Sequence, residues 1–195
     1  MHLFDVVLFA HIAIAIAAFS VAAILHTVQW ASRSATSVQQ LRAWVGATHR
    51  LEPLFPILAL ILFLFGGWLL HLSGGEFRWG MGWVITSSVT LGIMEALGGA
   101  FLASRGKQMY ELTKQEPDGP ISAELRAQVP DSVMWIVSHL ITGLALGVVY
   151  LMATKPNGWQ SVLIVAIVGG LGAAVGAAGA RVSSPQLQEQ APATA

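Results

Sequence analysis

Five apolar runs dominate the chain, and each is close to the roughly 20 residues that an α-helix needs to cross a bilayer core. They lie at about residues 4–29, 53–72, 81–104, 131–154 and 159–181. Only 10% of the 195 residues are charged, against roughly 25% in soluble domains. Because backbone groups in lipid must be hydrogen-bonded internally, such runs form helices. The sequence therefore predicts an all-α fold, a polytopic transmembrane helix bundle with five spans.

Lysine and arginine are divided unequally between the two ends of these predicted helices. Two lie on one side, Arg78 and Lys155. Eight lie on the other side: Arg33, Arg42, Arg50, Arg105, Lys107, Lys114, Arg126 and Arg181. Since cytoplasmic loops carry the excess of basic residues, we predict the N-terminus outside and the C-terminus in the cytoplasm. The chain is expected in the cell membrane, which is the inner membrane if the source is Gram-negative.

Residues 1–182 are expected to form a single transmembrane helical domain. Residues 121–128 predict a short surface helix, and Pro130 and Asp131 are expected to open the fourth span. Residues 183–195 lack apolar periodicity, so we expect a disordered tail there.

Small residues recur at helical spacing in the last two spans. They are Gly143 and Gly147 in the fourth, and Gly169, Gly172, Gly176 and Ala180 in the fifth. Small side chains let helix backbones approach closely, which drives association in lipid. The pattern indicates a compact bundle, and it makes the Gly/Ala-rich helix 159–181 a candidate surface for a homo-oligomer or a membrane partner.

Charge and cysteine content exclude several classes of function. The formal net charge is zero, whereas nucleic-acid binding needs a clustered basic surface. The chain has no cysteine, which excludes disulfides, thiolate metal sites, iron–sulfur clusters and cysteine nucleophiles. The remaining chemistry is that of histidine and carboxylate, and neither a catalytic residue nor a metal site is indicated.

Glu95 interrupts an apolar run at ~13 Å from the predicted cytoplasmic end of its helix. A charged acid at such depth is disfavoured by about 2.5–3.5 kcal/mol. Ser88, Gly92 and Gly99 share its helical face, so this face should contact another helix. His139 lies at a similar depth, ~12 Å, in the fourth span. We therefore predict that Glu95 and His139 form an intramembrane polar pair that shares a proton, either as a structural pair or for proton or ligand handling.

Histidine is also a common axial ligand of haem iron. His26, His49 and His71 lie near the predicted membrane boundaries, where histidine is well tolerated. His11 and His139 lie deeper, which makes them the candidate haem ligands. His11 and His26 share one helix but are ~22 Å apart along its axis.

The stretch "LFAHIAIAIAAF", the basic segment that follows the first span, and "PILALILFLFGGWLL" carry a family resemblance. The chain resembles small integral membrane proteins related to the membrane domain of copper resistance protein D. It is distantly similar to HemJ-type protoporphyrinogen oxidases, and the similarity covers about the first half of the chain. In the HemJ type an early histidine is implicated in haem binding, and this role would fall on His11.

Three functions remain open from the sequence. The first is a membrane redox protein that binds haem b. The second is a proton- or cation-linked transporter that uses Glu95 and His139. The third is a structural or assembly protein of the membrane without chemistry of its own.

Overall fold

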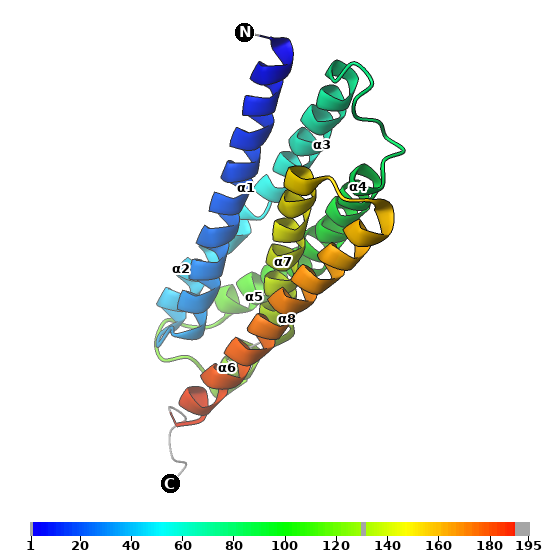
Figure 1. Cartoon of the computed structure of the whole chain (residues 1–195). Coiled ribbons are helices and arrows are strands. Elements are labelled where there is room, and N and C mark those ends of the chain that lie inside the picture. Colours follow the sequence, from blue (N-terminus) through cyan, green and yellow to red (C-terminus); the bar gives the residue numbers. More distant parts are fainter. Residues whose placement is uncertain (1, 130–131, 190–195) are drawn as a thin grey trace.

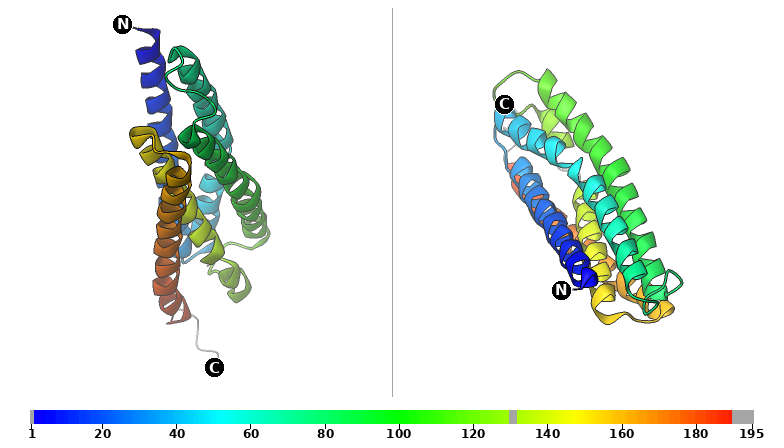
Figure 2. Two further views of the ribbon diagram at one scale, coloured as in Figure 1. Left: turned by 45° about the vertical axis from the view of Figure 1, so that its right-hand side comes forward. Right: turned by 90° about the horizontal axis from the view of Figure 1, so that it is seen from above.

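The computed structural model describes residues 2–129 and 132–189, without the side chains of residue 128 and residues 182–189. These residues form helices and no strand (Figures 1 and 2). The elements are α1 (Leu3–Arg33), α2 (Val38–Leu51), α3 (Leu54–Leu72), α4 (Gly82–Glu95), the π-helix η1 (Ala96–Leu102), α5 (Ala103–Gln115), α6 (Ala123–Gln128), α7 (Ser132–Thr154) and α8 (Gly158–Glu189).

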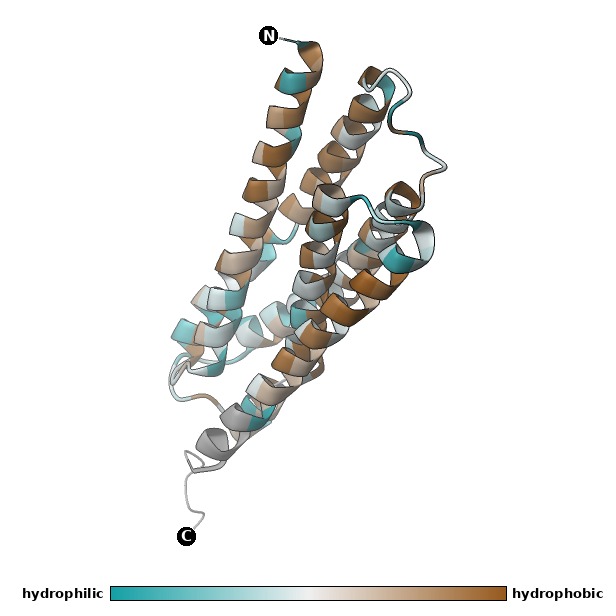
Figure 3. Ribbon diagram, in the orientation of Figure 1, coloured by the Kyte–Doolittle hydropathy of each residue, from teal (hydrophilic) through white to brown (hydrophobic). Residues whose placement is uncertain are grey.

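Five helical segments of the described chain are long and apolar enough to cross a membrane, so the predicted all-α bundle is confirmed. The first is α1, the second joins α2 to α3, the third joins α4, η1 and α5, the fourth contains α7, and the fifth is α8 as far as Arg181. Hydrophobic residues predominate along these helices (Figure 3), and many large apolar side chains are exposed. Phe9, Ile16 and Trp159 are 73%, 62% and 67% exposed, which suits contact with lipid tails.

α1 begins and α8 ends at opposite ends of the bundle, as an odd number of crossings requires (Figure 1). We call the end where α1 stops and α2 begins the basic end, because eight of the lysines and arginines belong to the segments that meet there. Which end faces the cytoplasm stays a prediction.

The end of α8 differs from the predicted boundary. The helix continues to Glu189, past residue 183 where the disordered tail was expected to begin. The rest of the predicted tail, residues 190–195, lies outside the described residues, as do Pro130 and Asp131.

The basic segments that the sequence indicates as connections fold into a small helical layer. Ser37 caps α2 by accepting a hydrogen bond from the Gln40 N–H at 3.3 Å, and Ser122 caps α6 in the same way at the Leu125 N–H. The predicted surface helix at 121–128 is therefore present as α6. A buried apolar cluster joins α2 to α6: Ala35, Val38, Leu41, Val45 and Leu125.

α7 and α8 pack with their backbones in close approach. A Cβ added at Gly143 would lie 3.1 Å from Gly169 Cα, and one added at Gly147 would lie 3.2 Å from Val165 Cα. A Cβ at Gly176 would lie 2.9 Å from Ile136 Cα. The small residues that the sequence singles out thus bring these two helices together within the chain. An oligomer or partner contact through α8 stays a prediction.

Gly172 offers a direct test of this packing. Its added Cβ would meet the His139 carbonyl oxygen and lie 3.1 Å from Gly143 Cα, so Gly172→Ala should separate the helices and lower the free energy of unfolding by about 1–3 kcal/mol. Gly170 is the matched control, because nothing lies within 4 Å of its added Cβ and alanine favours helix there. Unfolding in mixed detergent measures both variants. Equal stability of Gly172→Ala and Gly170→Ala would contradict the packing.

Candidate functional site

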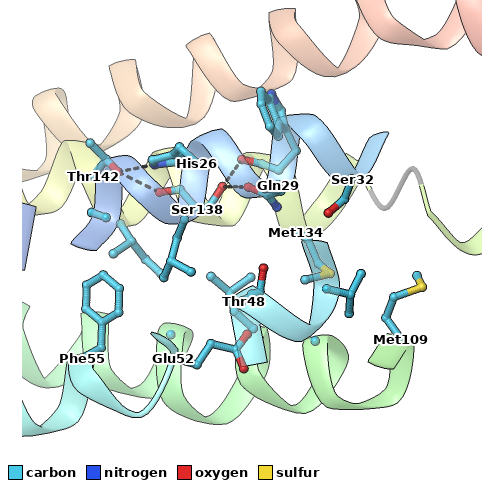
Figure 4. Close-up of a pocket in the computed structure, with 18 of the residues that line it drawn as sticks. His26, Gln29, Ser32, Thr48, Glu52, Phe55, Met109, Met134, Ser138 and Thr142 are labelled. Atoms are coloured by element: carbon cyan, nitrogen blue, oxygen red, sulfur yellow. Dashed lines mark hydrogen bonds between the residues drawn. The ribbon is translucent and has the colours of Figure 1, made fainter. Parts of the chain in front are cut away.

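A cavity of about 180 Å³ lies between α1, α2, η1, α5 and α7, on the side of the bundle toward the basic end (Figure 4). Its walls are mainly apolar, with polar groups from α1 and α7 on one side and carboxylates from the α2 end and the α4 end on the other. This volume is below the roughly 300–1,000 Å³ of pockets that hold drug-sized ligands. The cavity therefore suits a small molecule or one part of a larger one.

The polar wall begins with His26, whose tautomer follows from its neighbours. Its Nε2 lies 2.8 Å from the Thr142 hydroxyl, and that hydroxyl donates to the Ser138 carbonyl oxygen at 3.1 Å. A hydroxyl has one proton to donate, so the Thr142 oxygen must accept the N–H from His26 Nε2. The neutral His26 ring then carries its lone pair on Nδ1, which is buried and has no partner within the described part of the chain.

His139 lies against His26, with ring centroids 4.7 Å apart. The Nδ1 of His139 donates to the Trp135 carbonyl oxygen at 2.8 Å, because a carbonyl can only accept. The lone pair of neutral His139 is therefore on Nε2. Two imidazole rings in contact thus each keep one nitrogen able to accept a proton or a hydrogen bond.

Ser138 and Gln29 extend this polar wall toward the basic end. The Ser138 hydroxyl lies 3.0 Å from the Gln29 Oε1 and 2.9 Å from the Trp135 carbonyl oxygen, and Figure 4 shows these groups side by side with His26. The helical spacing of Trp135, Ser138, His139 and Thr142 gathers all four on one side of α7. Trp135 and His139 also lie against Gly179 and Gly176 of α8, so these two side chains stand between α1 and α8.

Two carboxyl groups occupy the opposite wall. Glu52 is the residue at which α2 ends, and Pro53 interrupts the helix there because it lacks an N–H. A Cβ added at Gly106 would lie 2.5 Å from Glu52 Oε1, so the glycine makes room for this carboxyl group against α5. Glu95 is the last residue of α4. Neither acid forms a hydrogen bond or an ion pair with another residue that the structure describes.

The π-helix η1 begins directly after Glu95 and runs through the cavity wall. It contains Gly98 and Gly99, which line the cavity, and both residues weaken an α-helical ladder. π-helical turns are rare and are often found at functional sites. A straight α-helix was expected over residues 81–104, and no feature of its hydropathy indicates the change of helix type.

The structure separates some of the predicted site residues and brings others together. Glu95 lines the cavity, whereas the ring neighbours of His139 are His26 and Trp135, and no hydrogen bond between Glu95 and His139 is found in the described structure. The shared proton of that pair stays a prediction. His11 lies ~22 Å along α1 from His26, and its nearest glycine neighbour is Gly66 of α3. His11 and His139 therefore cannot ligate one iron together.

Glu52 and the contact between His26 and His139 did not emerge from the sequence. Glu52 stands in a basic, polar segment where an acid is unremarkable, although its position directly before Pro53 and an apolar run marks a helix break. His26 was set aside as an interfacial residue because of its depth alone. Among residues 2–129 and 132–189, no cluster of three or more His, Asp or Glu side chains could hold a metal ion.

Fold and site together define a multi-pass α-helical membrane protein with a mainly apolar cavity, lined by a few polar groups, between its membrane-spanning helices. Comparison of the chain with known protein families, with curated proteins and with solved structures finds no match.

The hydrogen bond between His26 and Thr142 gives a test of the polar wall. Thr142→Val removes the acceptor of the His26 N–H and should lower the free energy of unfolding by about 1 kcal/mol, as for other hydrogen bonds between membrane helices. Nitrogen NMR of labelled histidine should show the proton on Nε2 of His26 and on Nδ1 of His139. The control is Thr154→Val, whose hydroxyl bonds only within α7, at the Tyr150 carbonyl. An Nδ1–H tautomer at His26 would refute the assignment.

Proposed function

We propose that this protein is a proton- or cation-linked membrane transporter in which Glu52 and Glu95 are the ion-binding groups. The observation that carries the proposal is that both carboxyl groups line one cavity between membrane-spanning helices without a protein partner in the described chain. Glu95 belongs to the transporter hypothesis drawn from the sequence, and Glu52 now joins it. His26 lines the cavity as a proton acceptor, and its ring contacts that of His139.

The energetics of carboxylates in membranes support this reading. An ionised acid inside a bundle is costly unless it is protonated or paired with a cation, and such residues commonly mark ion or proton pathways. Two acids in one cavity can exchange a proton for a cation, because either species removes the uncompensated charge. With the N-terminus outside, as proposed from the basic residues, this cavity lies toward the cytoplasmic half of the cell membrane.

The π-helix supplies a place where the third span can bend. η1 separates α4 from α5, and its wider turns leave a weaker hydrogen-bond ladder than the α-helices on either side. Bending there would move Gly106 on α5 relative to Glu95 on α4, and so would change access to the cavity. In this proposal the motion alternates the exposure of the two acids.

Reconstituted vesicles test the transporter. Vesicles that are acidic inside and contain a pH-sensitive dye are mixed with external Na⁺, K⁺ or choline, and exchange of one of these cations for protons should raise the internal pH. Glu95→Gln and Glu52→Gln keep shape and hydrogen bonding but remove titration, so each should reduce the rate to that of empty vesicles.

Glu76→Gln serves as the matched control, because Glu76 is an exposed acid in the connection between α3 and α4. It should leave the exchange rate unchanged. The proposal is wrong if the internal pH of wild-type vesicles rises no faster than that of empty vesicles with all three cations. It is also wrong if the Glu95→Gln and Glu52→Gln variants exchange at the wild-type rate.

Haem b binding is the second candidate, and one observation favours it. His11 Nδ1 is buried within the bundle and has no partner in the described structure, and an unprotonated ring nitrogen is what haem iron requires. Since the rings of His26 and His139 touch, no macrocycle fits between them, and a haem would be held by one histidine.

Expression with haem precursor supplied tests this candidate by absorption spectroscopy. A Soret band is expected in the purified protein, weakened by His11→Ala and unchanged by His71→Ala at the exposed end of α3. A purified protein without a Soret band would count against haem. If the protein shows neither cation–proton exchange nor a Soret band, the structural or assembly role is the remaining hypothesis.

A further inference from the structure

We propose that Arg33 and Trp135 form a binding site for the acidic head group of an amphipathic molecule whose apolar chain lies in the cavity. The site is at the basic end of the cavity, where α1 stops and α7 begins. The inference does not depend on transport, because it concerns a different set of side chains and a ligand of opposite charge.

Arg33 is the buried charge that the fold leaves without compensation. Arg33 is only 7% exposed, and it lines the cavity. Nε, Nη1 and Nη2 are all buried, and none has a hydrogen-bond partner in the structure as described. Guanidinium stays charged at any physiological pH and carries five N–H donors, so a buried one calls for an acceptor.

Trp135 adds a sixth donor next to this guanidinium. The Arg33 Cζ lies 4.9 Å from the centre of the Trp135 ring, a cation–π contact that holds the two side chains together. The Trp135 Nε1–H is also buried without a partner in the described chain. Both residues line the cavity.

The acids of the cavity do not fill this role. Glu52 and Glu95 line the same cavity, yet neither forms an ion pair with Arg33. A ligand must therefore bring its own negative oxygens. Carboxylate and phosphate groups match the fork of an arginine side chain with two parallel hydrogen bonds.

The walls next to Arg33 indicate what else the ligand carries. Met109 and Met134 line the cavity close to the basic end, and they offer contact to apolar groups. An inorganic anion would leave this surface uncovered, whereas an acyl or alkyl chain would fill it. The shared chemistry is thus an oxyanion attached to an apolar chain, which either an anionic bilayer lipid or a free amphiphile could supply.

Binding of radiolabelled dodecyl phosphate to the full chain, purified in a neutral detergent, tests the site. Arg33→Gln should weaken binding roughly tenfold to hundredfold, the equivalent of one hydrogen-bonded charge. Trp135→Phe keeps the ring but removes the N–H, and should weaken binding several-fold. Arg33→Lys keeps the charge without the fork, and should fall between wild type and Arg33→Gln.

Three comparisons make the result decisive. Arg181→Gln, which removes an exposed arginine near the same end, should bind as wild type does. Inorganic phosphate and dodecanol, the head and the chain alone, should each compete poorly. Phosphatidylglycerol in nanodiscs should displace the probe if the source is a bilayer lipid, and should not if it is a free amphiphile.

The proposal is overturned if wild type and the Arg33→Gln and Trp135→Phe variants bind dodecyl phosphate equally, since the guanidinium would then be satisfied by water. Competition by dodecanol as strong as that by dodecyl phosphate would also overturn it. Either failure leaves the cation-exchange assay unaffected, so the two proposals fail separately.

Discussion

The close approach of α7 to α8 is the interaction on which the polar interior depends. Lipid tails compete with apolar side chains for contact, so helices in a bilayer associate where small residues allow their backbones to meet. Gly143 and Gly147 supply this contact on one face of α7. The neighbouring residues His139 and Thr142 are thereby held in place, and their hydrogen bonds need a fixed geometry.

The hydrogen bonds of that face determine where protons and lone pairs lie. The Thr142 hydroxyl oxygen accepts a hydrogen bond from the N–H of His26, and the Trp135 carbonyl oxygen accepts one from the N–H of His139. Each ring is left with one free nitrogen in a setting where water is scarce. The cavity therefore combines a proton acceptor at His26 and a cation at Arg33, both on α1, with acids at Glu52 and Glu95.

Hydropathy was enough to predict the five spans, because in lipid the apolar length of a helix is set by bilayer thickness and not by tertiary contacts. It also placed Glu95 inside the bundle. Depth along an axis does not determine which side chains touch, however, since that depends on the rotation and tilt of each helix. The contact between His139 and His26 depends on rotation and tilt in this way. Arg33 was counted only as a topological charge, because its burial arises from the packing of α1 against the start of α7.

The π-helix between α4 and α5 sets the rotation of α5 relative to α4. A π turn holds an extra residue compared with an α turn, so if η1 became regular α-helix with all its residues kept, everything beyond it would rotate by about 100° relative to α4. Gly106 would then turn away from Glu52, and the recess that admits this carboxyl group would close. The extra residue of the π-helix thus sets the rotation of α5 relative to α4 about the helix axis. It lets these two parts of the third span each face a different set of neighbouring helices.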